Sequence, residues 1–315
     1  MPYSDDMKIF SGNASMELTR GACEHVYAKM GEATVGTFSD GEVHVQIGEN
    51  IRGKDVFIIN STAPPINRNL MELLILIDAA RRASAARITA VLPYFGYARQ
   101  DRKDRPRAPI TAKLVSNMIV TAGADRVLTL DLHTDQIQGF FDIPLDHLSG
   151  DVEFVRHLKK RKKNGLVVVS PDTGSVRRAR EVASRLDAPL AIVDKRRAKA
   201  NESEVMNIIG EVEGMHALIF DDMIDTAGTL VKAAEALKEQ GALSVSACST
   251  HAVFSGDAIH RIQDSVLEEV LVSDSIALSP QALNCEKINV VTFAPLIGEA
   301  IKRIHEEKSV SILFR

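Results

Sequence analysis

The stretch "HALIFDDMIDTAGTLVKAAEALKEQG", residues 216–241, places an apolar run, a polar turn and a helical pattern in direct succession. The run "HALIF" predicts a buried strand, and the pattern from Leu230 to Gln240 predicts a helix that ends before a glycine. A buried strand that passes directly into a helix is typical of a parallel α/β sheet. Because such sheets bind ligands beyond the carboxyl ends of their strands, the turn is a candidate binding site.

The turn combines three carboxylates with a cluster of small residues. The cluster consists of Thr226, Ala227, Gly228 and Thr229. At a helix start, its backbone N–H groups and hydroxyls favour a phosphate. Asp221 and Asp222 would repel a phosphate, so they indicate vicinal hydroxyls or a hydrated Mg²⁺ on the same ligand. A helix cap at Asp225 would explain one carboxylate but not three. A sugar phosphate satisfies both halves of the turn.

The same alternation of apolar runs and helical patterns extends along the chain. The runs include "DVFIINS", "ITAVLPYF" and "RVLTLDL" in the first half, and "LVVVSPD", "LAIVDK", "SVSACSTHAVF" and "INVVTF" in the second. They predict an α/β fold with two domains, each a mostly parallel sheet flanked by helices. We expect the domains at residues 1–147 and 148–295, with a closing helix at about 296–315 that could pack on the first.

Composition excludes several classes of function. With 38 basic and 42 acidic residues, the charge balance does not indicate nucleic acid or membrane binding. The three cysteines form no CxxC pair, which suits a reducing compartment. The apolar run "LMELLILIDAA" contains Glu72 and Asp78 and is too short to span a bilayer, and the first residues lack a secretory pattern. We therefore expect a cytoplasmic protein.

Two groups of polar residues in the first half follow predicted strands. Arg99 and Gln100 belong to "ARQDRKD", whose cations suit a polyphosphate because arginine makes planar, bidentate contacts with phosphate oxygens. A solvated loop would have a similar composition. His133 follows "VLTLDL", where a lone histidine is more often a hydrogen-bonded packing residue than a ligand. Its role stays open on this pattern alone.

Two more groups follow strands in the second half. Asp172 comes after "LVVVSP", at a predicted strand end. Lys195 and Arg197 belong to "DKRR", which leaves the strand "LAIV" and enters the polar stretch "AKANESE". Cations on a loop that closes over a bound triphosphate would stabilise charge in a transition state. A solvent-exposed basic turn is the alternative.

These motifs resemble a known enzyme family. The turn is similar to the ribose-phosphate-binding loop that type I phosphoribosyltransferases share with ribose-phosphate diphosphokinase, which makes phosphoribosyl diphosphate (PRPP). Several segments match the diphosphokinase alone: "FSDGEVHVQIGENIRG", "YFGYARQDRKD", "DLHTDQIQGFFDIP", "SPDTG", "DKRR" and "SVSILF". The chain resembles the phosphate-activated class of this enzyme over nearly its full length. The resemblance implies two tandem phosphoribosyltransferase-like domains, with ATP contacted by the first and ribose 5-phosphate bound by the second.

The resemblance also implies a reaction and a set of site residues. The β,γ-diphosphoryl group of ATP would pass to the anomeric hydroxyl of ribose 5-phosphate, giving PRPP and AMP for nucleotide, histidine and tryptophan biosynthesis. The implied ATP-binding residues are Phe38, Asp40, Glu42, Arg99, Gln100 and His133. The implied sugar-binding residues are Arg197, Asp221, Asp222, Asp225, Thr226, Ala227, Gly228 and Thr229. His133 and Asp172 would hold Mg²⁺, and Lys195 and Arg197 would be catalytic.

In the family, Phe38, Asp40 and Glu42 lie on a hairpin of the neighbouring subunit, so the resemblance implies active sites shared within a homo-oligomer, usually a hexamer. Inorganic phosphate would activate the enzyme and ADP would inhibit it. Two positions depart from the family pattern. Asn50 lies in "GENIRG" near the implied regulatory anion site, and Ser175 replaces a glycine after Asp172, where its hydroxyl would tighten or obstruct the pocket.

Two other functions are compatible with parts of the sequence. A phosphoribosyltransferase would keep the loop but would leave "ARQDRKD", "DLHTDQ" and "DKRR" without a task. A non-catalytic subunit associated with the diphosphokinase would tend to lose catalytic side chains, which are retained here. Walker, Rossmann, HExxH and G-x-S-x-G motifs are absent from the sequence, so other nucleotide, zinc and serine-hydrolase sites are not indicated.

Overall fold

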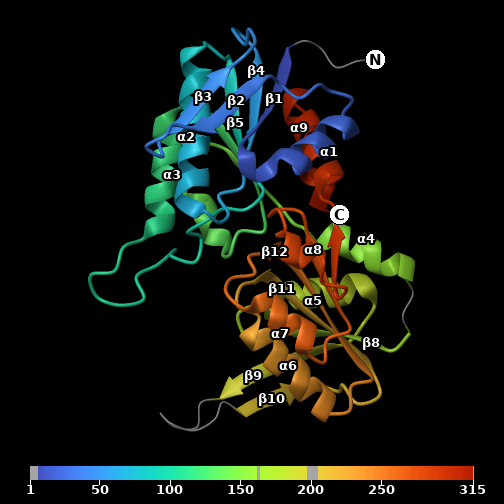
Figure 1. The fold of residues 1–315 in the computed structure, drawn as a ribbon. Helices are drawn as coiled ribbons and strands as arrows, with labels where there is room; N and C mark the ends of the chain where they lie inside the picture. Colours follow the sequence, from blue (N-terminus) through green and yellow to red (C-terminus); the bar gives the residue numbers. More distant parts are fainter. Residues whose placement is uncertain (1–5, 162–163, 197–204, 315) are drawn as a thin grey trace. The chain divides into compact units, whose positions relative to one another are not determined.

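The computed structural model describes residues 6–161, 164–196 and 205–314. The chain forms two compact units. The first comprises Met1–Gly150, Ser275–Ala277 and Thr292–Arg315, and the second comprises Asp151–Asp274 and Leu278–Val291. Each unit has its own sheet with helices packed on it (Figure 1). The predicted fold class is confirmed. The assignment of ATP to residues 1–147 and of the sugar to residues 148–295 stays a prediction.

The sheet of the first unit consists of parallel strands that follow one another in chain order. The order is β1 (Met7–Ser11), β4 (Asp55–Ile59), β5 (Arg87–Leu92), β6 (Arg126–Leu130) and β7 (Leu145–Leu148). Strand β4 is apolar on both faces, as expected for a parallel strand that helices cover on both sides. A separate hairpin pairs β2 (Ala33–Thr37) with β3 (Val43–Ile47).

Helices cover both faces of this sheet (Figure 1). One face carries α2 (Ile66–Arg82) and α3 (Thr111–Ala122), and the other carries α1 (Met16–His25) and α9 (Ala294–His305). Helix α2 buries residues at the i, i+3, i+4 and i+7 spacing of an amphipathic helix: Leu70, Leu73, Leu74 and Ile77. Short 3-10 segments occur at Asn13–Ser15, Asp135–Phe140 and Ser311–Phe314.

The closing helix α9 packs on the first unit. A Cβ at Gly298 would lie 2.8 Å from the carbonyl oxygen of Ala22, so glycine is what allows α9 to approach α1 this closely. Arg87 donates to both carboxylate oxygens of Asp55, at 2.8 and 2.6 Å, and also to the carbonyl of Ile304. The end of α9 is therefore held at the amino end of the sheet.

The sheet of the second unit is longer and has one antiparallel edge. The order is β10 (Val205–Ile209), β9 (Leu190–Arg196), β8 (Leu166–Ser170), β11 (His216–Ile224), β12 (Ser244–Ala252), β13 (Glu269–Ser273) and β14 (Ile288–Val291). Strand β10 runs antiparallel to β9. The helices of this unit are α4 (Asp151–Arg161), α5 (Val176–Leu186), α6 (Gly228–Glu239), α7 (Ala258–Asp264) and α8 (Pro280–Leu283).

The strand order of the second sheet reverses between β8 and β11. From β8 the chain moves outward to β9 and β10, then returns to β11 and continues in the opposite direction to β14. Such a reversal opens a crevice at the carboxyl ends of the two central strands, because the connections leave them in opposite directions. The carboxyl ends of β8 and β11 therefore mark the expected ligand position in this unit.

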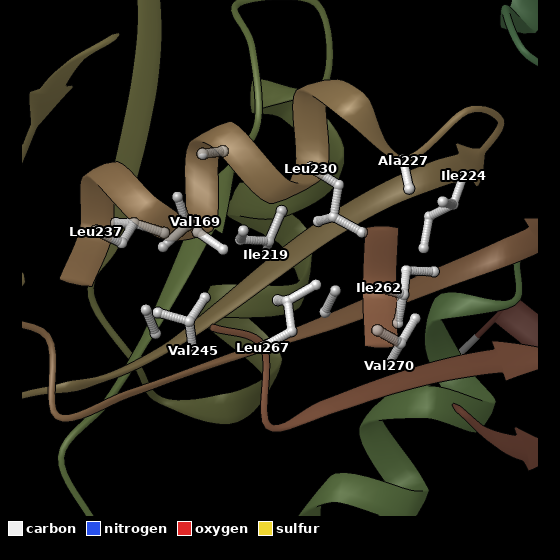
Figure 2. Packing of buried hydrophobic residues seen from close by; sticks show 14 of the residues in the cluster. Val169, Ile219, Ile224, Ala227, Leu230, Leu237, Val245, Ile262, Leu267 and Val270 are labelled. Atoms are coloured by element: carbon white, nitrogen blue, oxygen red, sulfur yellow. The ribbon is translucent and has the colours of Figure 1, made fainter. Parts of the chain in front are cut away.

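A hydrophobic core under α6 fixes these strand ends. Val169 and Ile219 from the sheet pack with Leu230 and Leu237 from α6, as Figure 2 shows, and with Ile262 from α7. These positions have the period of two along the strands and of three to four along α6 that the sequence predicts.

Several element boundaries differ from the sequence prediction. The closing helix α9 spans Ala294–His305 instead of about 296–315. Strand β11 does not end at Phe220 but continues to Ile224, because β12 pairs with it as far as Ile224 and Ala252. Helix α6 begins at Gly228, two residues earlier than predicted. Strand β10 was not predicted at all. Within the described residues, the search for a helix long and apolar enough to cross a membrane finds none.

Candidate active site

A cavity of about 200 Å³ lies at the strand-order reversal of the second unit. Its walls come from the segment after β8, the end of β11, the start of α6 and the middle of β12. They include Asp172, Asp221 and residues 225–229. The structure thus brings together one carboxylate from each central strand end and the predicted phosphate loop, although residues 172 and 221 are far apart in the sequence.

The phosphate loop is short and ends in a helix N-terminus. Residues 225–227 alone connect β11 to α6, and Ala227 adopts the left-handed backbone conformation with φ of 59°. The N-cap residue of α6 is Ala227, whose side chain makes no cap, and the N–H groups of the first turn favour an anion. The small residues matter here because a bulky side chain would stand between these N–H groups and a ligand.

Arg261 is a cation beside this loop that the sequence reasoning missed. It lies on α7, and its Nη1 donates to the carbonyl oxygen of Thr226 at 2.9 Å. The same nitrogen would be 3.5 Å from a Cβ at Gly228. A guanidinium at this distance adds positive charge beside the helix N-terminus. The sequence did not predict this role, because a single arginine on a later helix forms no recognisable motif.

Asp221 is largely buried, and its carboxyl group has a shifted pKa. Burial and the neighbouring charge of Asp222 raise the pKa of Asp221 to about 7. Two hydrogen bonds oppose this shift because they stabilise the carboxylate. The Ser175 hydroxyl and the Asp222 N–H both donate to Oδ1 of Asp221, each at 2.9 Å. The side chain of Asp222 also interacts directly with that of Asp221, which contributes to the raised pKa of Asp221.

Asp172 closes a tight turn after β8. Its Oδ1 accepts hydrogen bonds from the N–H groups of Gly174 and Ser175, both at 2.9 Å. One carboxylate oxygen therefore shapes the turn, and the carboxylate is fixed at the cavity wall.

Most of the predicted catalytic pair lies outside the residues that the structure describes. Lys195 belongs to β9, opposite Met206 of β10, and its side chain lies outside the described part. Arg197 lies outside the described residues altogether. The prediction that "DKRR" leaves the strand was wrong for its first three residues, because antiparallel pairing with β10 extends β9 to Arg196.

In the first unit, the predicted ATP residues lie on two loops that follow neighbouring strands. Arg99 and Gln100 follow β5 and are exposed, and Oε1 of Gln100 accepts a hydrogen bond from Thr111 Oγ1 at 2.6 Å. His133 follows β6 and is exposed. The two loops are joined because Thr134 Oγ1 donates to Asp101 Oδ2 at 2.8 Å.

The predicted hairpin around Phe38 is confirmed as an element. The N–H of Phe38 donates to the carbonyl of Glu42 at 2.8 Å, and the N–H of Glu42 donates to Asp40 Oδ1 at 3.0 Å. Gly41 has a φ of 97°, which a side chain would strain. Phe38 is 54% exposed at the tip, and its ring makes a T-shaped contact with the ring of His44, with 5.0 Å between the centroids.

Asn50, which departs from the family pattern, closes a turn of its own. Its Oδ1 accepts from the N–H of Arg52 at 3.1 Å, and Nη1 of Arg52 donates to Ser84 Oγ at 3.1 Å.

Known proteins with similar sequences cover the whole chain. Residues 7–123 match the N-terminal domain of ribose phosphate pyrophosphokinase, and residues 196–315 match the phosphoribosyl synthetase-associated domain. A ribose-phosphate pyrophosphokinase of Caldanaerobacter subterraneus subsp. tengcongensis is 56% identical over 313 residues, 99% of each chain. One of Vibrio cholerae is 57% identical over 311 residues, 98% of this chain and 99% of the other. The chain belongs to the ribose-phosphate pyrophosphokinase family.

The fold of this family member agrees with that of a solved relative. The phosphoribosylpyrophosphate synthetase from Mycobacterium smegmatis is 39% identical, covers 96% of this chain and all of its own, and superposes with a TM-score of 0.91. Because full-length relatives share one enzyme name, the chain is an enzyme of the ribose-phosphate pyrophosphokinase type. Neither a phosphoribosyltransferase nor a non-catalytic associated subunit is favoured.

Proposed function

We propose that this pyrophosphokinase transfers the β,γ-diphosphoryl group of ATP to the anomeric hydroxyl of D-ribose 5-phosphate, giving PRPP and AMP. The observation that carries the proposal is the cavity of the second unit. It combines an anion-binding helix N-terminus with half-buried carboxylates at a strand-order reversal. A sugar that is phosphorylated at one end and carries a diol at the other matches both halves of this cavity.

In the proposed complex, the two halves of the cavity bind opposite ends of the sugar. The 5-phosphate accepts hydrogen bonds from the loop that runs from Asp225 to Thr229, with Arg261 adding charge beside it. Asp221 and Asp222 accept hydrogen bonds from the ribose hydroxyls. Arg197, which is not among the described residues, is also proposed to contact the sugar.

The ATP-binding residues are assigned to the first unit. Arg99 and Gln100 hold the polyphosphate, since arginine contacts phosphate oxygens in pairs and the Gln100 amide adds donors. The exposed Phe38 ring offers a stacking surface for the adenine, and Asp40 and Glu42 supply acceptors for its amino group. His133, exposed beside the Thr134–Asp101 link, contacts the phosphate chain.

Mg²⁺ is the cofactor that this site would take, held by His133 and Asp172 together with phosphate oxygens. Among the described residues there is no cluster of three or more side chains of the kinds that could hold a metal ion. The Asp172 carboxylate fits Mg²⁺, which often binds through one or two carboxylates and completes its shell with substrate phosphates and water; His133 is assigned from the family resemblance. When bound, the ion neutralises charge on the diphosphoryl group.

In the transfer step, the anomeric oxygen forms a bond to the β-phosphorus as the bond from that phosphorus to the α-phosphate oxygen breaks, and AMP leaves. The anomeric hydroxyl loses its proton, and no residue is assigned as its base. Lys195 and Arg197 are proposed to stabilise the charge of the transferring group. The protein otherwise contributes positioning, as is usual for phosphoryl transfer.

Assembly and regulation are proposed from the family resemblance. We expect a homo-oligomer, a hexamer in the first instance, in which the hairpin around Phe38 serves the active site of a neighbouring subunit. Inorganic phosphate as activator and ADP as inhibitor would act near Arg52, Arg102 and the tail from Ser309 to Ser311. A cytoplasmic location completes the proposal.

A product assay tests the reaction directly. Purified protein is incubated with Mg²⁺, ribose 5-phosphate and ATP, with and without inorganic phosphate, and the nucleotide and sugar products are separated. We expect AMP and PRPP in equal amounts. Formation of ADP, or no AMP under either condition, would overturn the proposal.

A further inference from the structure

The hydroxyl of Ser175 has an unusual partner for its position in the fold. Ser175 is the residue before α5, where a serine side chain normally accepts a hydrogen bond from the helix backbone. No such cap is formed here. The hydroxyl instead donates to Oδ1 of Asp221 at 2.9 Å, across the reversal from β8 to β11.

Ser175 therefore links two carboxylates of the cavity. Its N–H donates to Oδ1 of Asp172 at 2.9 Å, and its hydroxyl donates to Asp221. Asp172 follows β8 and Asp221 lies within β11, so the two carboxylates are far apart in the sequence. A single small residue thus constrains their relative orientation, because hydrogen bonds are directional.

We propose that Ser175 is a positioning residue that holds Asp221 in the orientation that binds the ribose diol. This inference rests on the proposed function, because the proposed function assigns Asp221 to sugar binding. With the Ser175 hydroxyl and the Asp222 N–H both on Oδ1, the carboxylate has little rotational freedom about its last bond. A carboxylate that is already oriented loses less entropy when a diol binds.

The same geometry decides between the two effects that a serine in place of glycine predicts. Ser175 is a partner of Asp221 rather than an obstacle to the ligand, because its hydroxyl points to a carboxylate that forms the cavity wall. Replacement by glycine would remove the hydrogen bond without opening space for the sugar. The hydroxyl therefore tightens the site.

The two links also separate sugar binding from nucleotide binding. Removal of the hydroxyl abolishes the hydrogen bond to Asp221 but leaves the backbone N–H on Asp172 in place. Since Asp172 is assigned to the Mg²⁺–ATP side and Asp221 to the sugar, the loss affects one substrate. A general loosening of the turn would affect both.

The test compares Ser175→Ala, Ser175→Gly and Ser175→Thr with the wild type and with Ser184→Ala. Ser184 is an exposed serine of α5 away from the cavity and serves as the matched control. Steady-state kinetics gives KM for each substrate, and calorimetric titration of ribose 5-phosphate into the enzyme without ATP gives its Kd independently of turnover.

We expect Ser175→Ala and Ser175→Gly to raise both KM and Kd for ribose 5-phosphate about tenfold, as for loss of one hydrogen bond to a charged group. KM for ATP should change by less than about twofold, because those contacts are unaltered. Ser175→Thr, which retains the hydroxyl, should restore sugar binding to within about threefold. Ser184→Ala should behave as the wild type.

Three outcomes would overturn the inference. Ser175→Ala and Ser175→Gly could bind the sugar as the wild type does, or Ser175→Gly could bind it more tightly. Alternatively, Ser175→Ala and Ser175→Thr could weaken both substrates equally, which would indicate a merely structural role. A wild-type enzyme that neither binds ribose 5-phosphate nor forms PRPP would overturn the proposed function as well, and this wild-type result distinguishes the two failures.

Discussion

The two units carry their candidate ligand residues at the carboxyl end of a parallel sheet, but they place them differently. In the first unit the strands follow one another in chain order, and the candidate ligand residues lie on exposed loops beyond β5 and β6. In the second unit the order reverses between β8 and β11, and Asp221 is still part of the strand. The difference teaches that a strand-order reversal allows a carboxylate to be carried by a strand instead of a loop. The cost is the desolvation of that carboxylate.

That cost is visible in the two sets of charged groups. Burial raises the pKa of Asp221 to about 7, so keeping this carboxylate ionised opposes folding at neutral pH. Arg99 and His133 of the first unit are exposed and keep their hydration. Substitutions should therefore separate function from stability in the first unit and couple them in the second.

The largest effect is expected at Lys195, the catalytic candidate on β9. Lys195→Ala should lower kcat by about 10²–10³-fold and leave the affinity for ATP nearly unchanged, because the ammonium is proposed to act mainly in the transition state. Turnover is measured by AMP release, and ATP affinity by equilibrium binding. Lys238→Ala on α6 is the control. Equal losses in binding and in kcat would contradict the catalytic role.

A smaller effect is expected at Arg99 in the first unit. Arg99→Ala should raise KM for ATP about 10- to 100-fold, since a paired contact with phosphate oxygens is lost. KM for ribose 5-phosphate and the melting temperature should stay near the wild-type values, because Arg99 is exposed. A loss of several degrees in melting temperature would break the proposed separation of function and stability.

The second unit should show the opposite behaviour at Asp221. Its pKa is about 7 in the folded protein against an ordinary value of 3.8, so the folded state binds the extra proton between these pH values. Stability from this group is present below about pH 4 and is lost as the pH rises through about 7. Asp221→Asn removes this pH-dependent loss of stability. The melting temperature of the variant at pH 8 should therefore be about 2–6 °C above that of the wild type. The variant should also lose sugar binding.

The measurement is a melting curve at pH 5 and pH 8 in the presence of a chelator, which excludes stabilisation by bound metal. The difference between variant and wild type should be larger at pH 8. A constant difference at both pH values would show that Asp221 is ionised throughout this range and that the cost of burial is small. Asp172→Asn, at the same cavity but with its Oδ1 bonded by two N–H groups, provides the comparison.

Sequence patterns predicted the local structure of the second candidate site better than that of the first, because its residues are close together in the sequence. Asp221 and the loop that ends at Thr229 lie in one strand, turn and helix, so their chemistry is readable from spacing alone. What the patterns missed depends on partners elsewhere in the chain. Strand β11 is prolonged by its ladder to β12, and Ser175 and Arg261 reach the site from other strands and helices.

In the first unit the patterns identified residue types without their arrangement. Arg99 and His133 are separated by a helix and a strand, and their loops meet through the hydrogen bond from Thr134 to Asp101. A threonine and an aspartate at that separation give no recognisable spacing. The hairpin around Phe38 was readable because its glycine and its alternating strands are local. The adenine assigned to this hairpin was implied by the family resemblance alone.

The smallest effect tests how far the exposed site of the first unit is organised. Thr134→Val removes the donor to Asp101 but keeps the shape of the side chain, and Thr134→Ser keeps the donor. Because both loops are exposed, water replaces much of the lost hydrogen bond, and KM for ATP should rise only about two- to fivefold in Thr134→Val. Thr134→Ser should match the wild type. An effect as large as that of Arg99→Ala would mean that the link organises the whole site, and the contrast between a site held by loops and one held by strands would then fail.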